Sequence, residues 1–332
     1  MTTSQLEFAQ GTPLIRQAFD LAARAHADQR EEFDDQPYIA HPVEVARLLY
    51  AAGYDPEVVA AGLLHDTVER SEVTLHELEA RFGPRVAALV RALTEPSQNG
   101  SFEQRKALLR DQVASAGADA EAIFAADKVA KSASLRRALV QLGDEEVARR
   151  VEHSLEEKLD HYHASLDLLS KVAADLPLVP RLKAELEEIA TTRAHDRDFE
   201  PARRAIEAVN RRDPGALLEV CSQDVEWWPA LTLGDNGGPY RGAAGIRRYI
   251  ADLHSTWSSL AIELEDIRSN GSRVLAVCRM HGVGRRPDAS IDRRAVAVFH
   301  VAAGKILGAR VLLGGPARPL AGAAGHLPAG AR

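Results

Sequence analysis

The sequence predicts two domains, an all-helical N-terminal bundle followed by an α+β domain. The chain has 332 residues, and a domain usually takes roughly 100–200. Apolar residues recur at three- and four-residue spacing through the first half, whereas β-branched runs such as residues 295–301 occur in the second half. Helices followed by strands are typical of an α+β domain. We therefore expect a helical domain at 1–192, a linker at 193–200, the α+β domain at 201–315 and a disordered tail at 316–332.

Composition limits the class of protein. The chain carries 41 Lys and Arg against 48 Asp and Glu, a net charge of −7, so we expect no nucleic-acid partner. No apolar run approaches about 18 residues, and we expect no membrane partner. The first ten residues lack the basic and apolar segments of a signal peptide, and Cys221 and Cys278 form no disulfide framework. These features predict a cytoplasmic protein.

Helix start and stop signals divide the first half. The pair Asp-Pro at 55–56 predicts an N-cap followed by proline in the first helical position. Thr74 and Glu77 predict a capping box, and the pair Gly-Pro at 83–84 ends one helix and starts the next. Polar, glycine- or proline-containing segments predict loops at 31–37 and 95–101.

The second half begins with two predicted helices and continues with strands. We expect the helices at 202–211 and 214–221, and a hairpin turn at Gly304 and Lys305. The tail is rich in Gly, Ala and Pro, which predicts disorder. Strand-like runs occupy 225–228, 261–267, 274–280, 295–301 and 306–313.

Two histidines and two aspartates are candidate metal ligands. His65 and Asp66 follow an apolar run at 58–64 that predicts a buried helix, where unpaired polar groups are costly. His41 lies at a predicted helix start, and Asp127 lies on another apolar helical run. Imidazole and carboxylate ligands suit Mn²⁺, Fe²⁺ or Zn²⁺. Taken singly, each side chain is better explained as a satisfied core histidine or a helix-capping aspartate.

Six segments in a fixed order give these residues their context. The segments are HADQR (26–30), PYIAHPVEVARLL (37–49), LLHDTVER (63–70), FG-x-x-V-x-x-LV-x-x-LT (82–94), AADK (125–128) and EEKLDHYHASL (156–166). In this order they resemble the HD-type hydrolase domain of Rel/Spo-type alarmone enzymes and of the small alarmone hydrolases, over roughly residues 10–185.

The resemblance implies a chemistry and a ligand set. It implies that His41, His65, Asp66 and Asp127 hold a divalent metal, usually Mn²⁺. It also implies that the domain removes the 3′-pyrophosphate of guanosine tetra- or pentaphosphate, leaving GDP or GTP. We recognise no Rel/Spo synthetase region after the helical domain, so we expect hydrolysis without synthesis.

Glu69 and Arg70 are the expected catalytic residues. Glu69 lies one helical turn after His65 and could orient or deprotonate the attacking water. The resemblance favours this role over that of a solvated helix residue. Family members usually carry a second acid directly after this glutamate, and Arg70 replaces it here. Arg70 could pair with a substrate phosphate, or the water could be activated differently.

The expected substrate contacts are Arg30, Lys128 and Lys131, and they also depart from the family. A loop that commonly reads Q-x-R-K reads Gln-Arg-Glu-Glu at 29–32, so acids weaken a basic contact that Arg30 could partly keep. Lys131 replaces a family asparagine and could contact phosphate or ribose.

The second half contains the segments ARRAIEAVNRRDPGALLEVCSQDVEWWP, PYRGAAGIRRYIADL and RRAVAVFHVAAGKI. With these segments, residues 201–315 resemble the SnoaL-like/NTF2-like fold. The resemblance implies a cone of curved, mostly antiparallel sheet around an apolar pocket, but this fold does not fix function. We favour a module that binds a second, apolar ligand or forms a homodimer. Side chains that could line the pocket, although a core or surface role is favoured for each, are Trp227, Trp228, Tyr240, Trp257, His281, Arg294 and His300.

Three hypotheses remain open. The first is an alarmone hydrolase fused to a sensor or dimerisation domain. The second is a metal-dependent phosphohydrolase for another nucleotide, which the changes at Glu31, Arg70 and Lys131 motivate. The third is a non-catalytic nucleotide-binding module, for which Arg70 is the main support.

Overall fold

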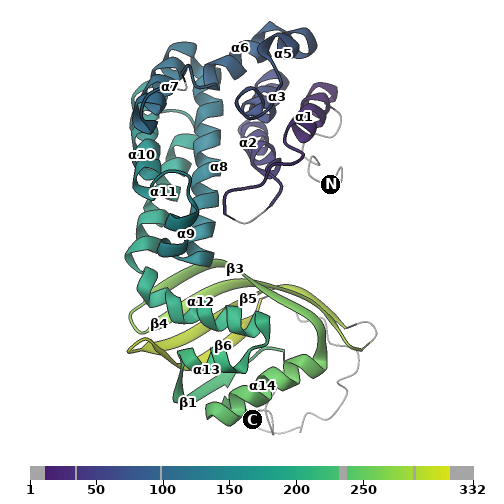
Figure 1. Cartoon of the computed structure of the whole chain (residues 1–332), viewed down its shortest axis with the longest axis vertical. Coiled ribbons are helices and arrows are strands. Elements are labelled where there is room, and N and C mark those ends of the chain that lie inside the picture. The colour runs from purple at the N-terminus through teal and green to yellow at the C-terminus, as the bar shows by residue number, and fades with distance from the viewer. Residues whose placement is uncertain (1–11, 34–35, 98, 232–237, 287–288, 315–332) are drawn as a thin grey trace, which may run out of the picture. The chain divides into compact units, whose positions relative to one another are not determined.

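The chain divides into two compact units (Figure 1). The computed structural model describes residues 12–33, 36–97, 99–231, 238–286 and 289–314. One unit comprises Met1–Leu139 and Asp144–Thr191, and the other comprises Val140–Gly143 and Thr192–Arg332. The expected disordered tail lies outside the described residues. Among the described residues, no helix combines the length and apolarity needed to span a membrane.

The first unit is all-helical, as the sequence predicts. Its helices are α1 (Pro13–Ala25), α2 (Ala40–Ala51), α3 (Pro56–Leu64), α4 (Thr67–Arg70), α5 (Leu75–Phe82), α6 (Pro84–Leu93), α7 (Phe102–Ala116), α8 (Ala118–Leu142), α9 (Asp144–Arg150), α10 (Leu155–Val172) and α11 (Leu178–Ala194). Helices α8 and α11 run on into residues that group with the second unit.

Helix α3 lies at the centre of the first unit. All residues from 58 to 64 are buried, because α1, α2 and α6 pack around the helix. The Asp55 carboxylate accepts hydrogen bonds from the backbone N–H groups of Glu57 and Val58, so the predicted cap is confirmed. This packing fixes the end of α3, where the His-Asp pair follows.

Other predicted boundaries are confirmed in part. Gly83, with φ of 89°, separates α5 from α6. The Thr74 hydroxyl accepts a hydrogen bond from the Glu77 N–H, which is one half of the predicted capping box. Complete boxes that we did not predict begin α7 and α10, at Ser101 and Ser154.

The second unit is an α+β domain. Its helices are α12 (Asp196–Arg211), α13 (Pro214–Val220) and α14 (Gly242–Thr256), and its strands are β1 (Cys221–Trp228), β2 (Tyr240–Arg241), β3 (Trp257–Asn270), β4 (Arg273–Gly284), β5 (Ser290–Ala302) and β6 (Lys305–Leu313). The expected linker at 193–200 is wrong, because α11 extends to Ala194 and α12 begins at Asp196. Phe199 is only 1% exposed and anchors this first turn in the core.

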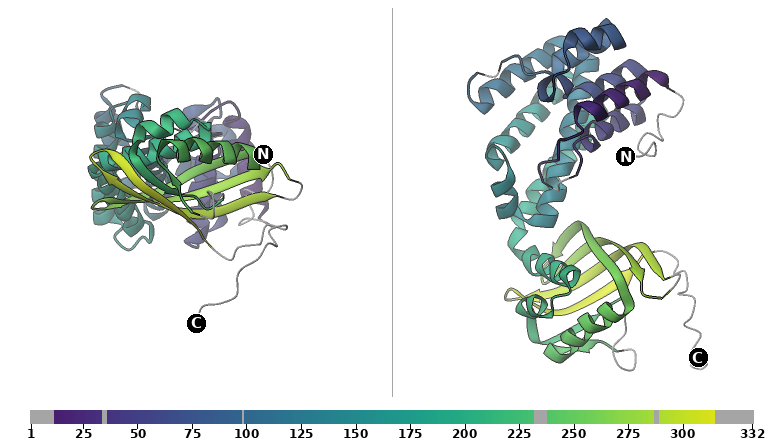
Figure 2. Two further views of the ribbon diagram at one scale, coloured as in Figure 1. Left: turned by 90° about the horizontal axis from the view of Figure 1, so that it is seen from below. Right: turned by 45° about the vertical axis from the view of Figure 1, so that its right-hand side comes forward.

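One mixed sheet forms this unit, in the order β2-β1-β6-β5-β4-β3. Strands β1 and β6 are parallel and the other pairs are antiparallel, so the expected mostly antiparallel sheet is confirmed. Helices α12, α13 and α14 lie over one face (Figure 2). The last hairpin turns at Ala303 and Gly304, both with positive φ, one residue earlier than predicted.

Candidate metal centre

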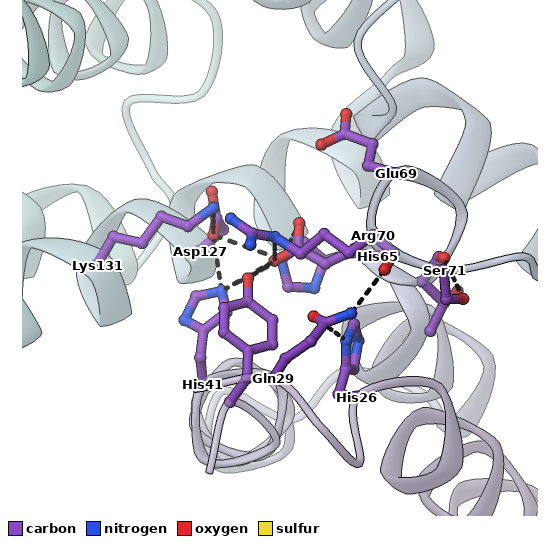
Figure 3. A network of polar contacts seen from close by, with 12 residues as sticks. His26, Gln29, His41, His65, Glu69, Arg70, Ser71, Asp127 and Lys131 are labelled. Atoms are coloured by element: carbon purple, nitrogen blue, oxygen red, sulfur yellow. Dashed lines mark hydrogen bonds and ion pairs between the residues drawn. The ribbon is translucent and has the colours of Figure 1, made fainter. Parts of the chain in front are cut away.

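Two histidines and two aspartates converge in the first unit (Figure 3). His41 is the second residue of α2, His65 and Asp66 follow α3, and Asp127 lies on α8. The two histidine Nε2 atoms are 3.3 Å apart, and they lie 3.1 and 3.4 Å from the Asp127 Oδ1 atom. Asp66 oxygens lie 3.2 Å from the His65 Nε2 and 3.6 Å from the His41 Nε2. Three separated segments of the chain therefore meet at one point.

The donor set fits a divalent cation. The His65 Nδ1 lies 2.8 Å from the Gly62 carbonyl oxygen, so Nδ1–H donates to this oxygen and Nε2 faces His41 and the carboxylates. Asp127 Oδ1 is buried and accepts no well-aligned hydrogen bond within the described ranges, although the Lys131 Nζ lies 2.9 Å away. Ligand atoms of His41, His65 and Asp127 all lie within 4.8 Å of one another. Two imidazoles beside buried carboxylates are ordinary ligands of Mn²⁺, Fe²⁺ or Zn²⁺.

The electrostatics of the cluster favour cation binding. Burial lowers the pKa of His41 to about 4, so this imidazole is neutral. Burial also opposes protonation of His65, but Asp66 and Asp127 outweigh it and raise the pKa of His65 to about 10. Burial would raise the pKa of both aspartates, yet neighbouring cations hold each well below its usual range. A cation bound to the His65 Nε2 would take the place of this proton.

Neighbouring side chains hold the two carboxylates. The Tyr38 hydroxyl donates a hydrogen bond to Asp66 Oδ2. The Lys128 Nζ lies 2.7 Å from Asp127 Oδ2, opposite the Lys131 contact with Oδ1. We did not predict the role of Tyr38, although it lies three residues before His41 in the segment PYIAHPVEVARLL (37–49).

The Arg70 guanidinium is also close to the cluster. Its Nε lies 3.9 Å from Asp66 Oδ2, and its carbon Cζ lies 4.5 Å from the centre of the Tyr38 ring. The Arg70 carbonyl accepts a hydrogen bond from the Gln29 side chain, whose oxygen contacts His26 (Figure 3). Tyr38 and Gln29 therefore hold the residue that replaces the family's acid.

A cavity of about 500 Å³ adjoins the cluster. Eight Lys and Arg side chains and five Glu side chains are among its lining residues, together with His41 and Tyr38. All five side chains that we expected to touch substrate or act in catalysis line it: Arg30, Glu69, Arg70, Lys128 and Lys131. Its positive wall is suited to a phosphorylated molecule.

Glu69 faces this cavity rather than the metal ligands. Its Oε1 accepts a hydrogen bond from the Glu95 backbone N–H. In Figure 3 its carboxylate stands apart from the contacts among the histidines and aspartates. Burial, and then the charge of Asp66, raise the pKa of Glu69, which makes it a stronger base than an exposed glutamate.

Several cavity residues were missed by the sequence analysis. Glu32 contacts the Lys158 Nζ and accepts a hydrogen bond of 3.1 Å from the Glu152 N–H, so one expected repulsive acid is already paired. Lys158 lies in the segment EEKLDHYHASL (156–166), but the sequence alone does not indicate that it contacts Glu32. Further unpredicted cations that line the cavity are Arg105, Lys106 and Arg150.

The second unit holds a much smaller cavity. It measures about 30 Å³ and its wall is apolar, with Trp227, Tyr249 and Phe299 among the lining residues. Of the seven side chains that we considered for this pocket, Trp227 lines it. Tyr240 and Trp257 are buried elsewhere in the core. The other four lie away from the cavity, because Trp228 packs under Arg310, Arg294 pairs with Glu265, and His281 and His300 are exposed.

Comparison with known proteins agrees with both units. Residues 18–166 match the family model of the HD domain, and residues 202–309 match that of the SnoaL-like domain. The chain is 40% identical over 126 residues to the human guanosine-3′,5′-bis(diphosphate) 3′-pyrophosphohydrolase MESH1, which is 37% of this chain and 70% of the relative.

Two further similarities concern the helical unit. A probable guanosine-3′,5′-bis(diphosphate) 3′-pyrophosphohydrolase from Synechocystis is 46% identical over 85 residues, which is 26% of this chain and only 11% of that relative. A solved metazoan orthologue of SpoT, described as hydrolysing ppGpp, superposes with a TM-score of 0.44 at 25% identity, over 54% of this chain and 94% of the other.

Proposed function

The chain belongs to the family of HD-domain guanosine-3′,5′-bis(diphosphate) 3′-pyrophosphohydrolases, and on this premise we propose that its helical unit hydrolyses guanosine tetra- or pentaphosphate. In this reaction water attacks the phosphorus bound to the ribose 3′ oxygen, that P–O bond breaks, and GDP or GTP and pyrophosphate leave. The observation that carries the proposal is the convergence of His41, His65, Asp66 and Asp127 beside a basic cavity.

We assign the four converging residues to a divalent ion, Mn²⁺ in the first instance. When bound, such an ion polarises a phosphoryl oxygen and lowers the pKa of a water molecule. Tyr38 and Lys128 orient the carboxylates of Asp66 and Asp127 through the contacts described above. Other divalent ions with the same ligand preferences are alternatives that a metal screen distinguishes.

The side chains around the cavity have separate tasks in this proposal. Arg30, Lys131 and Arg70 bind and neutralise the phosphates, because their charges line the cavity. Glu69 acts as the base, since one of its oxygens is held by the Glu95 N–H and the other is left to take a proton from the attacking water. The ribose 3′ oxygen takes up a proton as it leaves.

Substitutions of Arg70 test whether its guanidinium binds a phosphate of the substrate. If its guanidinium binds phosphate, Arg70→Met raises KM for the nucleotide about 10-fold and changes kcat little, because the interaction is equal in ground and transition states. If instead the lysine- and arginine-rich wall merely retains nucleotide, neither wild type nor Arg70→Asp will show turnover. The latter result would favour the non-catalytic binding module.

The decisive assay is a nucleotide panel with purified, manganese-loaded protein, read by phosphate and pyrophosphate release. We expect pyrophosphate from guanosine tetraphosphate, and we expect Glu69→Gln to reduce kcat by about 100-fold or more. Turnover of another nucleotide, with guanosine tetraphosphate left intact, would instead support a phosphohydrolase of different specificity.

For the second unit we propose self-association, and a small apolar ligand as the lesser alternative. Leu275, Val283 and Leu312 are 38%, 55% and 53% exposed on strands β4 and β6, which supports pairing of two sheets. The cavity of about 30 Å³ has room for only about two water-sized groups. Light scattering of wild type and Leu312→Asp tests the dimer, and an unchanged monomeric mass in both would refute it.

We also propose that the chain acts in the cytoplasm. Cys221 and Cys278 are buried free thiols, as expected in a reducing compartment. Fractionation of cells that express the tagged full-length chain tests this assignment.

A further inference from the structure

His161 presents an unused hydrogen-bond donor at the wall of the large cavity. It lies on α10, is 2% exposed and lines the cavity. The Arg110 Nη1 lies 2.9 Å from its Nδ1. Arginine can only donate, so Nδ1 must accept this hydrogen bond. The neutral ring therefore carries its proton on Nε2, and Arg110 fixes that tautomer.

The His161 Nε2–H group has no hydrogen-bond partner anywhere in the described part of the chain. Its surroundings explain this, because the ring lies edge-on to Phe102, with centroids 6.0 Å apart, and near Phe124 and Tyr162. Aromatic edges cannot replace the lost hydrogen bond to water. Burying a polar group without a hydrogen-bond partner is unfavourable, so this donor is suited to a ligand oxygen.

Two lysines lie beside the same rings. The Lys106 Nζ is 5.4 Å from the Phe102 ring centre, and the Lys128 Nζ is 4.5 Å from the Phe124 ring centre. Both lysines line the cavity. Burial, followed by the charges of Lys128 and Lys106, holds the pKa of His161 well below its usual range, so the imidazole is neutral beside them. A neutral N–H donor and two ammonium groups match the oxygens of an anion.

His161, Lys106 and Lys128 lie next to the metal ligands, but none of the three is itself a metal ligand. The Lys128 ammonium contacts Asp127 Oδ2 at 2.7 Å and, through the Phe124 ring, also borders His161. The Lys106 ammonium also contacts the Glu95 carboxylate. An anion bound here would therefore sit beside the metal centre.

We propose that His161, Lys106 and Lys128 form a second anion-binding recess, which binds a phosphoryl group of the substrate other than the one attacked at the metal centre. The identity of the nucleotide rests on the proposed function. The bound group has two sources in a guanosine bis(diphosphate): the outer phosphate of the 3′-diphosphate, which leaves in the pyrophosphate, or the 5′-phosphates. Both offer the same oxygens to the Nε2–H donor.

The first test is binding without turnover. Inorganic pyrophosphate is titrated calorimetrically into full-length, metal-free protein, because the recess consists of side chains alone. We expect His161→Phe to weaken binding about 10- to 100-fold, since a hydrogen bond to a charged group is lost. The matched control is His163→Phe, which changes an exposed histidine on the same helix. Equal affinity in His161→Phe and wild type would overturn the proposal, whether or not the protein is an enzyme.

Folding is controlled with a rescue variant and a spectroscopic readout. His161→Asn keeps an N–H donor, so we expect it to recover at least part of the affinity that the phenylalanine loses. In wild type, the ¹⁵N resonances of His161 should report a proton on Nε2, and Arg110→Met should relax this preference. A proton found on Nδ1 in the wild type would contradict the donor assignment.

The second test identifies which phosphate is bound. We compare kcat/KM for guanosine tetraphosphate, for an analogue with a 3′-monophosphate, and for an analogue without 5′-phosphates. The loss caused by His161→Phe should vanish for the analogue that lacks the group held in the recess. An equal loss of kcat/KM for all three substrates would show that His161 contributes only to packing. Absence of turnover in every wild-type reaction would refute the proposed function and leave the calorimetric result to judge the recess.

Discussion

Asp66 is held by the Tyr38 hydroxyl and lies beside the His65 imidazole and the Arg70 guanidinium. The hydroxyl matters most for geometry, because it is buried with the carboxylate and donates to one of its two oxygens. Arg70 reaches the same oxygen only at 3.9 Å. Tyr38 therefore limits the rotation of the Asp66 carboxylate, as residues behind metal ligands commonly do.

Removing this hydroxyl should loosen the metal site without unfolding the protein. We expect Tyr38→Phe to weaken Mn²⁺ binding by about 10- to 100-fold, the usual effect of losing such a partner. Isothermal titration with Mn²⁺ measures it, and Tyr50→Phe, at an exposed position of α2, is the control. Equal metal affinities in wild type and Tyr38→Phe would show that the hydroxyl does not position Asp66.

The predictability of the site differs from residue to residue. Sequence motifs in a specific order along the chain made it possible to predict the four ligands His41, His65, Asp66 and Asp127. The structure brings these four side chains together. Tyr38, Lys158 and His161 could not be assigned, because their roles depend on partners 28, 126 and 51 residues away in the chain. Such pairings are set by helix packing, which local spacing does not encode.

At the scale of elements, α2 and α3 bring the two histidines together through a close approach at Gly62. A side-chain methyl added there would lie 2.6 Å from the Leu49 Cδ1 and 3.4 Å from the Val45 Cγ1. Leu49 is fully buried, so it has little room to move. Glycine at this position therefore lets the helices approach closely enough for His41 and His65 to face each other.

Gly62→Ala should therefore destabilise the protein despite the higher helix propensity of alanine. Overpacking costs about 1–3 kcal/mol, and alanine returns about 1 kcal/mol, so we expect a net loss of about 1 kcal/mol. Urea unfolding measures it. Leu49→Ala alone should be destabilising, but in the double variant the two costs should not add, because the clash is gone. Strict additivity would contradict a contact between these positions.

Glu95, in the segment after α6, forms ion pairs with two residues of α7. Its carboxylate lies 3.1 Å from the Arg105 Nε and contacts the Lys106 Nζ. Burial would raise the pKa of Glu95, but the hydrogen bonds and charges of these two cations lower it overall. A carboxyl group with a lowered folded pKa stabilises the native state above its unfolded pKa and loses this effect as pH falls through the folded pKa.

Glu95→Gln should accordingly be destabilising at neutral pH and nearly neutral in acid. We expect a loss of about 1–2 kcal/mol at pH 7, after allowance for partial solvent screening. The difference from wild type should shrink below pH 4.5, the ordinary pKa of the group. Chemical unfolding at several pH values tests this, with exposed Glu79→Gln as control. A difference that grows on acidification would show that the sign is wrong.

Element boundaries were predictable where a capping side chain marked them. Asp55 and the Gly-Pro pair at 83–84 satisfy local backbone requirements, and the helices begin and end there. The start of α12 was not predictable in this way. Its first residues are polar and resemble a linker, but Phe199 packs into the second unit's core, and Asp196 forms an ion pair with Arg203. Tertiary packing decided this boundary, not local propensity.

At the scale of the whole molecule, each unit has its own hydrophobic core and the metal ligands belong to one of them. The second unit's core is built around Trp227, Phe299 and Ile306. The first unit's core surrounds α3. Both fold classes could be predicted, because periodicity separates helices from strands, whereas the exact division within α8 and α11 could not, because continuous helical patterns cross it.

Metal binding should therefore stabilise the two units unequally. Because His41, His65, Asp66 and Asp127 all lie in the first unit, Mn²⁺ at about 100 times its Kd should stabilise that unit by about 2.7 kcal/mol. The second unit should gain nothing directly. Calorimetric unfolding should thus show two transitions, of which manganese raises the temperature of only one.

The intrinsic fluorescence of the chain assigns the other transition, since all three tryptophans, Trp227, Trp228 and Trp257, lie in the second unit. In His65→Ala both transitions should ignore manganese. One transition that moves as a whole in the wild type would instead show that the units unfold together, and the helices that run from one unit into the other would then transmit metal binding to the sheet.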